Sequence, residues 1–454
     1  MSQRREQWAS RLGFILAAAG SAIGLGAVWK LPYVAGTNGG GAFFFIFILL
    51  TLTLGASLML AEFILGRHTN KDAIQSYKAI APGTPWFLVG ALGIVASFLL
   101  LSFYAVVGGW IVTYFFRSIT GQLQAPDGDF GALFGQITAN PWEVGIAHFV
   151  FILITIFVVR AGIRGGIERA SKLLMPALFI LFLVIVARSL TLDGAMEGVR
   201  FFLQPDFSEV TGETLLFALG QAFFALSLGV SIMVTYSSYV PKDTSLTRSA
   251  GSIIGLSLFI ALLSGLAIFP AVFSLGMSPE EGPPLIFIVL PAVFNEMAFG
   301  GFFFTLFLAL LLFATLTSAF SLLEILVAPF AKNDLNKRKR VTWISGLLVY
   351  IMGIPSALSF GILGDFTVFG NIFFDNMDFL VSNILLPLGA LLIALFVPWK
   401  INKDVLEEEL LRSSRLSRGF FLTWLFTIRF VTPAVIVIVF LYILGFLPGV
   451  EPTI

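Results

Sequence analysis

The sequence predicts an all-α integral membrane protein. Of its 454 residues, 58% are hydrophobic and only 12% are charged, which is more apolar surface than a water-soluble chain of this length can bury. The apolar residues form eleven segments, each long enough to cross about 30 Å of hydrocarbon as a helix. Positive charges recur in every second loop between these segments, as expected for loops on one side of a membrane.

The whole chain, 1–454, is predicted to form one transmembrane domain. Its spans are expected at 12–36, 41–66, 86–117, 143–160, 166–188, 213–239, 250–275, 300–330, 341–358, 376–398 and 420–447. The segment 281–297 is apolar but short and interrupted by proline, so we interpret it as a re-entrant or lid-like helical hairpin. The borders within 341–398 are the least distinct, because proline and glycine interrupt the apolar pattern there.

The loop charges predict the orientation. The basic residues flank span one and follow spans two, four, six, eight and ten: Arg4, Arg5, Arg11, Arg67, Lys71, Lys78, Arg160, Arg164, Arg169, Lys172, Lys242, Arg248, Lys337, Arg338, Lys339, Arg340, Lys400 and Lys403. The opposite loops are acidic. Because cytoplasmic loops carry the excess of Lys and Arg, we expect a cytoplasmic N-terminus in the plasma (inner) membrane and, after eleven spans, an extracellular C-terminus.

Small polar residues interrupt two spans in matching positions. The first span carries Gly20, Gly24 and Gly26, and the sixth carries Ser-Leu-Gly-Val-Ser at 227–231. These interruptions lie five spans apart. They therefore occupy corresponding positions in two repeats of five spans, at about 10–190 and 211–398. An extra span follows at 420–447. Since five is odd, the two units would have opposite topology. Paired interruptions in inverted repeats indicate the binding site of a transporter.

Unwinding a span changes its chemistry. Freed carbonyls can bind a hard cation such as sodium, and freed amides can hold an anion. The alternative is that the small residues only let two helices pack closely, but the matching positions favour a binding site. Thr317 and Ser318 add two adjacent hydroxyls in span eight, which either bond to their own helix or ligate sodium.

Several other classes of function are disfavoured. A net charge of +1 gives no basis for a nucleic-acid partner, and the absence of cysteine excludes disulfides and thiolate metal sites. We find no paired catalytic carboxylates, nucleophile motif or cofactor loop, so we expect no enzyme activity and no cofactor other than a coupling ion.

Five motifs make the chain resemble a known family. They are RLGFILAAAGSAIGLG at 11–26, NGGGAFF at 38–44, LAEFILGRH at 60–68, GQAFFALSLG at 220–229 and LTSAFSLLE at 316–324. The chain is similar to the neurotransmitter:sodium symporters, in particular to their bacterial, leucine-transporter-like amino-acid transporters. The resemblance implies a five-plus-five inverted-repeat fold that moves an amino acid inward with sodium by alternating access. Its partners would be the substrate, sodium and membrane lipid.

The resemblance also implies site residues. The second sodium site would use the carbonyls of Gly20, Ile23 and Ala314 with the hydroxyls of Thr317 and Ser318. The substrate pocket would comprise Ser21, Ala22, Leu25, Gly26, Tyr104, Phe224, Ser227, Val230, Ser318 and Leu322. Tyr104 would bind the substrate carboxylate and, with Phe224, form a thin outer lid. Gly24 stands where monoamine transporters have an aspartate, which favours a substrate that brings its own carboxylate.

Three features depart from the family pattern or vary within it. At the first sodium site only Ala22, Ala27, Ala225 and Ser257 are present, which suggests that only the second site works; alternatively, backbone, water and Ser257 suffice. Lys30 replaces the usual arginine of the outer gate pair with Asp378, which implies a looser gate. Gly166 and Pro176 have the spacing with which some members unwind span five.

The inner gate is incomplete. Arg5 matches the family's gate arginine, but its usual aspartate aligns with Lys332, leaving Asp334 as a substitute after Asn333. Glu62 and Glu324 lie in spans, either as structural acids or as proton-coupling groups. The competing functions are a sodium-independent or proton-coupled carrier or exchanger and a substrate-sensing receptor, which the lack of a long signalling tail disfavours.

Overall fold

The computed structural model describes residues 6–123, 128–276, 286–331, 334–412, 414, 416–443 and 446. In this part of the chain, ten helical segments are long and apolar enough to cross a membrane. The sixth predicted span is present as two shorter helices, α11 and α12, with an unwound segment between them. The chain is a multi-pass helical membrane protein as predicted, and an eleventh crossing formed by α11 and α12 stays a prediction.

The helices and strands have the following bounds. The first half comprises α1 (Arg11–Leu25), η1 (Gly26–Lys30), α2 (Leu31–Thr37), α3 (Gly41–Leu50), η2 (Thr51–Gly55), α4 (Ala56–Thr69), α5 (Ala73–Ile80), α6 (Phe87–Ile119), α7 (Phe130–Ala139), α8 (Pro141–Val159), η4 (Ile163–Glu168), α9 (Arg169–Leu190), α10 (Ala195–Leu203) and η5 (Phe207–Glu209). The second half comprises α11 (Gly212–Phe224), α12 (Ile232–Ser237), α13 (Leu246–Ser274), α14 (Val289–Glu296), α15 (Gly300–Ala331), α16 (Leu335–Leu358), β1 (Thr367–Val368), β2 (Asn371–Ile372), α17 (Phe373–Phe379), η7 (Leu380–Leu385), α18 (Leu386–Lys400), α19 (Lys403–Leu411), α20 (Arg418–Phe426), η8 (Thr427–Val431) and α21 (Thr432–Ile443). The two short strands form an antiparallel hairpin with Thr367 opposite Ile372.

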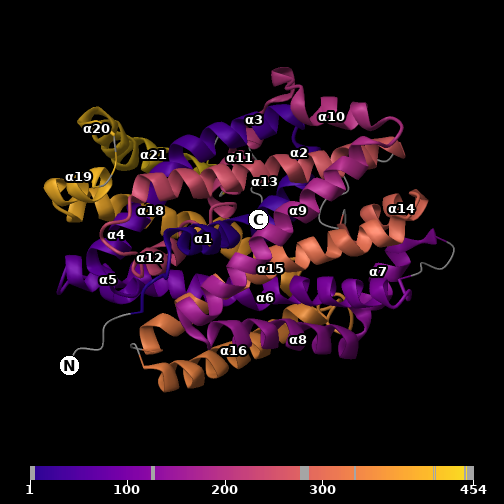
Figure 1. Ribbon diagram of the computed structural model, residues 1–454, viewed down its shortest axis with the longest axis horizontal. Helices are drawn as coiled ribbons and strands as arrows, with labels where there is room; N and C mark the ends of the chain where they lie inside the picture. Colours follow the sequence, from indigo (N-terminus) through magenta and orange to yellow (C-terminus); the bar gives the residue numbers. More distant parts are fainter. Residues whose placement is uncertain are drawn as a thin grey trace.

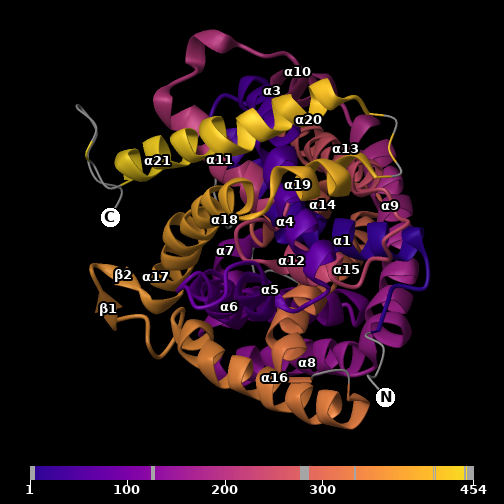
Figure 2. The same ribbon diagram turned by 90° about the vertical axis from the view of Figure 1, so that its left-hand side faces the viewer.

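The long helices run side by side along the horizontal axis of Figure 1. The short helices α5 and α19 lie at one end of this bundle, and α7, α10 and α14 lie at the other. Seen from the first end, α8 and α16 cover one side and α20 and α21 the opposite side, with α1 and α12 between them (Figure 2). The first span is 89% buried in its apolar window, against 33% for α16, so it forms the centre of the bundle.

The segment predicted as a hairpin at 281–297 has a different form in its described part. Residues 286–297 contain a single short helix, α14, which packs against α15. Residues 281–285 lie outside the described residues. The hairpin interpretation of 281–297 therefore stays a prediction, with α14 as the helix of its described part.

The interruption of the first span is narrower than predicted. We expected an unwound segment from Gly20 to Gly26, but the chain stays helical up to Ile23, and only Gly24 has non-helical angles (φ −19°, ψ −153°). A π-helical turn, η1, follows immediately. A π-turn shifts the hydrogen-bond register without ending the helix, so the break concentrates at one glycine.

The interruption of the sixth span is as predicted. Ser227, Gly229 and Ser231 all have positive φ, which ends α11 and restarts the chain as α12. The Gly229 amide donates to Oε1 of Glu62, at 2.9 Å. Gly229 also lies against α18, where a Cβ would come within 2.3 Å of the Leu386 carbonyl oxygen. Neighbouring spans therefore satisfy and fix the unwound backbone, as a membrane interior requires.

We expect Gly229→Ala to lower the free energy of unfolding by roughly 2–4 kcal/mol, because the side chain would be strained at φ +86° and would overlap Leu386. Thermal unfolding in detergent measures this. Gly255→Ala is the matched control, since Gly255 lies within α13 with no atom in reach of a Cβ. Equal melting temperatures for the two variants would contradict the prediction.

Span five is helical throughout in this structure. Gly166 lies in η4 and Pro176 in α9. A Cβ on Gly166 would come within 2.0 Å of the Val158 carbonyl oxygen, so close packing on α8 also requires a glycine here. Unwinding between Gly166 and Pro176 stays a prediction.

Candidate functional site

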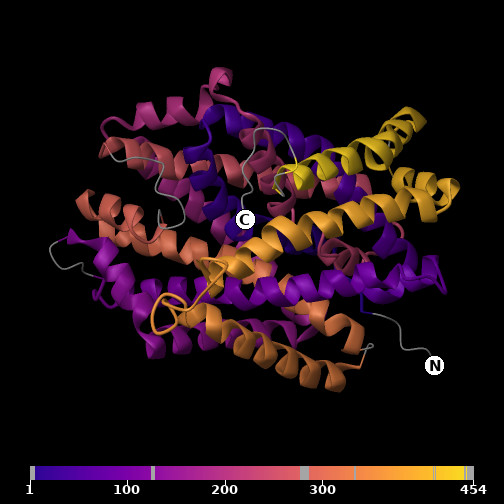
Figure 3. The same cartoon turned by 180° about the vertical axis from the view of Figure 1, so that it is seen from behind.

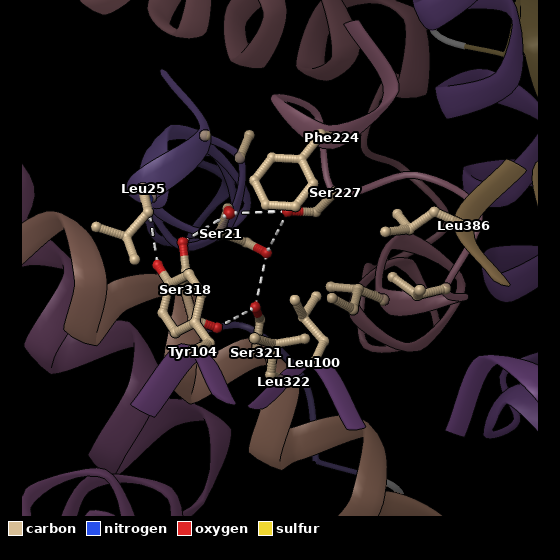
Figure 4. A pocket seen from close by; sticks show the side chains of 15 residues that line it. Ser21, Leu25, Leu100, Tyr104, Phe224, Ser227, Ser318, Ser321, Leu322 and Leu386 are labelled. Carbon is tan, nitrogen blue, oxygen red and sulfur yellow. Dashed lines mark hydrogen bonds between the residues drawn. The ribbon is translucent and has the colours of Figure 1, made fainter. Parts of the chain in front are cut away.

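A small pocket lies where the two interrupted spans meet (Figure 4). It has a free volume of about 30 Å³. Fifteen residues line it: Ser21, Ala22, Gly24, Leu25, Gly26, Leu100, Tyr104, Phe224, Ser227, Val230, Ile232, Ser318, Ser321, Leu322 and Leu386. The structure thus brings all ten predicted substrate residues together around one cavity, and their role in binding stays a prediction.

Four serines form the polar side of the pocket (Figure 4). The Ser21 hydroxyl lies 2.6 Å from that of Ser321. Ser227 and Ser318 each donate to the Ser21 carbonyl oxygen, both at 2.8 Å. Three different spans are therefore joined at Ser21, which is helical yet adjacent to the break at Gly24.

The remaining lining residues were not predicted from sequence. Ser321 follows Ser318 by three residues, so helical spacing alone could have placed it on the same face. Leu100, Ile232 and Leu386 come from three different helices. Nothing in the sequence distinguishes them from other apolar residues in spans, because their place depends on how the helices pack.

Leu25, Tyr104 and Phe224 separate this pocket from a larger outer cavity. All three line both spaces, and the outer one has a volume of about 270 Å³. The Tyr104 hydroxyl accepts a hydrogen bond from the Leu25 amide at 3.2 Å. Tyr104 and Phe224 therefore occupy the position of the predicted outer lid.

The predicted outer gate pair is not formed. Lys30 and Asp378 both line the outer cavity, but they make no salt bridge within 4 Å. Instead, the Lys30 ammonium lies 4.8 Å from the centre of the Phe224 ring, and Asp378 accepts a hydrogen bond from Ser382 at 2.7 Å. The two charges therefore face one cavity without direct contact in this structure, and their role as an outer gate pair stays a prediction.

Oxygen atoms converge at the predicted second sodium site. The Thr317 hydroxyl lies 3.0 Å from the Gly20 carbonyl oxygen and 2.9 Å from that of Ala314. The Ser318 hydroxyl lies 3.1 Å from the same Gly20 oxygen. Four of the five predicted ligands therefore meet between α1 and α15, with Ile23 three residues further along α1.

Gly20 is required for this convergence. A Cβ at residue 20 would come within 2.9 Å of the Thr317 Cβ and 3.1 Å of the Met175 sulfur. Because α9 and α15 both press on this point, only a glycine lets α1 approach closely enough for its carbonyl to meet the hydroxyls.

The first sodium site has fewer side-chain oxygens. Ser257 donates a hydrogen bond to the Ala225 carbonyl oxygen at 3.3 Å, and Ala27 is fully buried and offers only a methyl group. Gln221, which sequence reasoning missed, donates to the Gly26 carbonyl at 2.6 Å, and its own Oε1 is buried with no partner in the described part of the chain. The serine and one carbonyl are thus brought together as predicted, without an acid.

The inner gate falls partly outside the described residues, because Arg5, Lys332 and Asn333 are not among them. Asp334, the proposed substitute acid, caps α16 by accepting hydrogen bonds from the Asn336 and Lys337 amides. It is therefore already engaged at the start of a helix.

The chain next to Arg5 is held by other groups. Trp8 donates through its indole to the Tyr236 carbonyl oxygen at 3.0 Å. Glu168, at the base of span five, accepts from the Ala9 amide at 2.7 Å and the Ser10 hydroxyl at 3.0 Å, and pairs with Lys172. Sequence reasoning did not find Glu168, since its partners lie about 160 residues away.

The two acids within spans have protein partners. Glu62 binds the Gly229 amide, and Glu324 forms a buried ion pair with Arg338 and accepts from the Tyr239 hydroxyl at 2.8 Å. These contacts support the structural interpretation of both acids.

A helical membrane protein with two interrupted spans around one pocket, and hydroxyl and carbonyl oxygens gathered beside it, is a sodium-coupled secondary transporter. Residues 5–128 and 134–448 match the Sodium:neurotransmitter symporter family. The chain therefore belongs to this family, and the family implies sodium as the coupling ion.

Relatives of similar length agree with this assignment. The chain is 55% identical to YhdH, an uncharacterized sodium-dependent transporter of Bacillus subtilis (strain 168), over 98% of this chain and 99% of that one. It is 35% identical to an uncharacterized sodium-dependent transporter of Haemophilus influenzae over 97% and 98%. Its structure matches that of MhsT in complex with L-phenylalanine with a TM-score of 0.89 and 44% identity, over 96% and 99%.

Proposed function

We propose that this protein imports an L-amino acid with an apolar side chain, together with sodium, by alternating access. The observation that carries the proposal is the pocket at Gly24. Polar groups line its one side, and Leu100, Val230, Ile232, Leu322 and Leu386 line the rest. A substrate with a charged backbone and an apolar side chain fits this division, and the similar protein MhsT is described with L-phenylalanine.

The backbone break supports recognition of a zwitterion. Gly24 departs from helical angles. Beside it, the Leu25 amide donates to the Tyr104 hydroxyl, and the Gly20 and Ser21 carbonyl oxygens accept from side-chain hydroxyls and not only from the helix. Free amides favour a carboxylate, and free carbonyls favour an ammonium group or a cation. The Tyr104 hydroxyl, already bonded to the Leu25 amide, is placed to join the carboxylate site.

The loop charges support inward transport across the plasma membrane. The Lys- and Arg-rich loops belong to the end of the bundle that carries α5 and α19. The positive-inside rule assigns this end to the cytoplasm, and the outer cavity of Lys30 and Asp378 then opens on the opposite side. The inverted repeats 10–190 and 211–398 would exchange access between the two ends.

A binding screen tests the proposal. Purified protein is titrated with L-leucine, L-phenylalanine, L-glutamate and L-lysine in sodium and in a sodium-free buffer. We expect the two apolar amino acids to bind in sodium and all four to bind weakly without it. Absence of binding in either buffer would contradict an amino-acid substrate, and binding that ignores sodium would favour a sodium-independent or proton-coupled carrier.

We further propose that one sodium ion, at the second site, accompanies each substrate. Thr317 and Ser318 supply two hydroxyls there, whereas the first site offers alanines at 27 and 225 and the single hydroxyl of Ser257. A sodium ion needs several oxygens and compensating negative charge, and no acidic side chain has been found among the described residues of the first site.

We expect a stoichiometry of one sodium per amino acid in proteoliposomes, measured from the membrane potential at which net flux reverses. The Ser257→Ala variant should keep this value, because its hydroxyl would not be an essential ligand. A ratio of two in the wild-type protein, reduced to one by Ser257→Ala, would show instead that the first site works.

A further inference from the structure

Arg429 is a cation in the middle of an apolar span. It lies in η8, within the segment Arg418–Tyr442 that is apolar enough to cross a membrane. A charged side chain in a span is costly, and it normally faces a protein partner or water. The structure therefore has to supply something that stabilises the guanidinium.

No acidic side chain of the described residues forms an ion pair with Arg429. Three of the four acidic residues of the nearby helix α19 are paired with other arginines: Glu407 with Arg418, Glu408 with Arg412 and Glu409 with Arg67. The fourth, Asp404, forms no ion pair with Arg429 among the described residues. The Nε atom of Arg429 is buried and has no hydrogen-bond partner in the described part of the chain. Its charge is thus left without a counter-charge from these residues.

An aromatic surface surrounds the guanidinium. The Arg429 Cζ lies 3.6 Å from the centre of the Trp399 ring and 5.9 Å from that of Phe430. Trp399, Phe426 and Phe430 are 52%, 59% and 50% exposed. They belong to α18 and to α20–η8, which lie at the surface that faces the viewer in Figure 3. The stacked arginine therefore sits on the outside of the bundle, where lipid surrounds a membrane protein.

The ends of the neighbouring helices indicate how deep the Arg429 guanidinium lies in the membrane. Trp399 precedes Lys400, the last residue of α18, and Lys403 begins α19. A helical side chain points toward the N-terminus of its helix, and α20 begins at this same basic end. Arg429 is thus directed toward the membrane–water boundary, the level at which tryptophan is enriched and long cations extend to headgroups.

We propose that Arg429 and Trp399 form a binding site for the phosphate of an anionic phospholipid, with Phe426 and Phe430 against its acyl chains. A guanidinium binds phosphate through two parallel hydrogen bonds, and the neighbouring lysines Lys400 and Lys403 favour a headgroup with net negative charge. The stack on Trp399 holds the guanidinium plane so that its outer N–H groups stay available for the phosphate.

Native mass spectrometry of the detergent-purified protein tests this with phosphatidylglycerol as the probe. We expect Arg429→Gln to weaken retention of phosphatidylglycerol by about ten-fold or more. Arg418→Gln, a matched charge loss on the same span with a 72% exposed side chain, should retain it like the wild type. Phosphatidylcholine should bind more weakly than phosphatidylglycerol, and inorganic phosphate should not compete.

Two further variants keep the test decisive if Arg429→Gln does not fold. Arg429→Lys keeps the charge but loses the paired hydrogen bonds, and Trp399→Leu loses the stack, so each should reduce retention. Retention equal to the wild type in these variants would overturn the proposal. Conversion of a dimer to a monomer without any change in bound lipid would also overturn it, because a second copy would then cover Arg429.

Discussion

Replacing Thr317 by alanine should lower the apparent affinity for sodium by about 10- to 100-fold. The Thr317 hydroxyl lies within 3.0 Å of the Gly20 and Ala314 carbonyl oxygens, so together with Ser318 it joins α1 to α15 at the predicted second sodium site. Hydrogen bonds and ligands to a charged group are worth about 1.5–3 kcal/mol, and each 1.4 kcal/mol is about ten-fold in affinity. The measurement is the sodium concentration that half-saturates L-leucine binding.

Two variants make this result specific. Thr155→Ala removes a buried hydroxyl that bonds only to its own helix, to the Phe151 carbonyl, and should leave sodium dependence unchanged. Thr317→Ser keeps the hydroxyl and should restore most of the affinity. If Thr317→Ala melts like Thr155→Ala yet requires no more sodium than the wild type, Thr317 is not a ligand.

Gly24→Ala should weaken amino-acid binding by about 100-fold or more. A Cβ at this position would come within 2.1 Å of the Ser318 hydroxyl oxygen and 2.7 Å of the Tyr104 hydroxyl oxygen. The added methyl group would occupy the pocket, and overpacking of a closed site typically costs up to about 3 kcal/mol, which is roughly 100-fold. Equilibrium binding of L-leucine and L-phenylalanine in saturating sodium gives the value.

The control for this variant is Gly220→Ala in α11, where no atom lies within reach of the new Cβ. It should bind both amino acids as the wild type does. Thermal unfolding without substrate shows whether Gly24→Ala is folded. A folded Gly24→Ala protein with wild-type affinity would mean that the substrate lies elsewhere than beside Gly24.

Gly24 also explains a substrate preference suggested by sequence. The resemblance to the family pointed to a carboxylate-bearing substrate, because monoamine transporters have aspartate at this position. The structure shows that there is no room for a side chain at this position, since even one methyl group at residue 24 would overlap Ser318 and Tyr104. An aspartate would need both side chains to move, whereas a glycine leaves the space beside their hydroxyls open.

The spans and both interruptions could be predicted from the sequence. Hydrocarbon requires about twenty apolar residues per helix, and it forbids unsatisfied backbone except where protein or water meets it. The ten pocket residues were predicted from the resemblance to the family, whose motifs carry them over position by position. All ten line one cavity in the structure.

Charge pairing could not be predicted in the same way. Lys30 and Asp378 face one cavity as the predicted gate pair, but Lys30 lies over Phe224 and Asp378 accepts a hydrogen bond from Ser382. Glu324 was left without a partner in the sequence and proves to pair with Arg338. A long flexible side chain can reach several groups, so its partner is decided by which of them the packing brings nearest.

By itself, the sequence determined that this protein is a helical membrane protein with two matched breaks, because apolar length and small polar residues are local properties. Sodium ligation by Thr317 and Ser318 stays a prediction that rests on the family resemblance. Only the tertiary structure decided that the first break narrows to Gly24, that Glu168 holds the N-terminal segment and that Arg429 faces outward on Trp399. Each of these depends on how segments remote in the chain pack together, and local sequence patterns do not specify that packing.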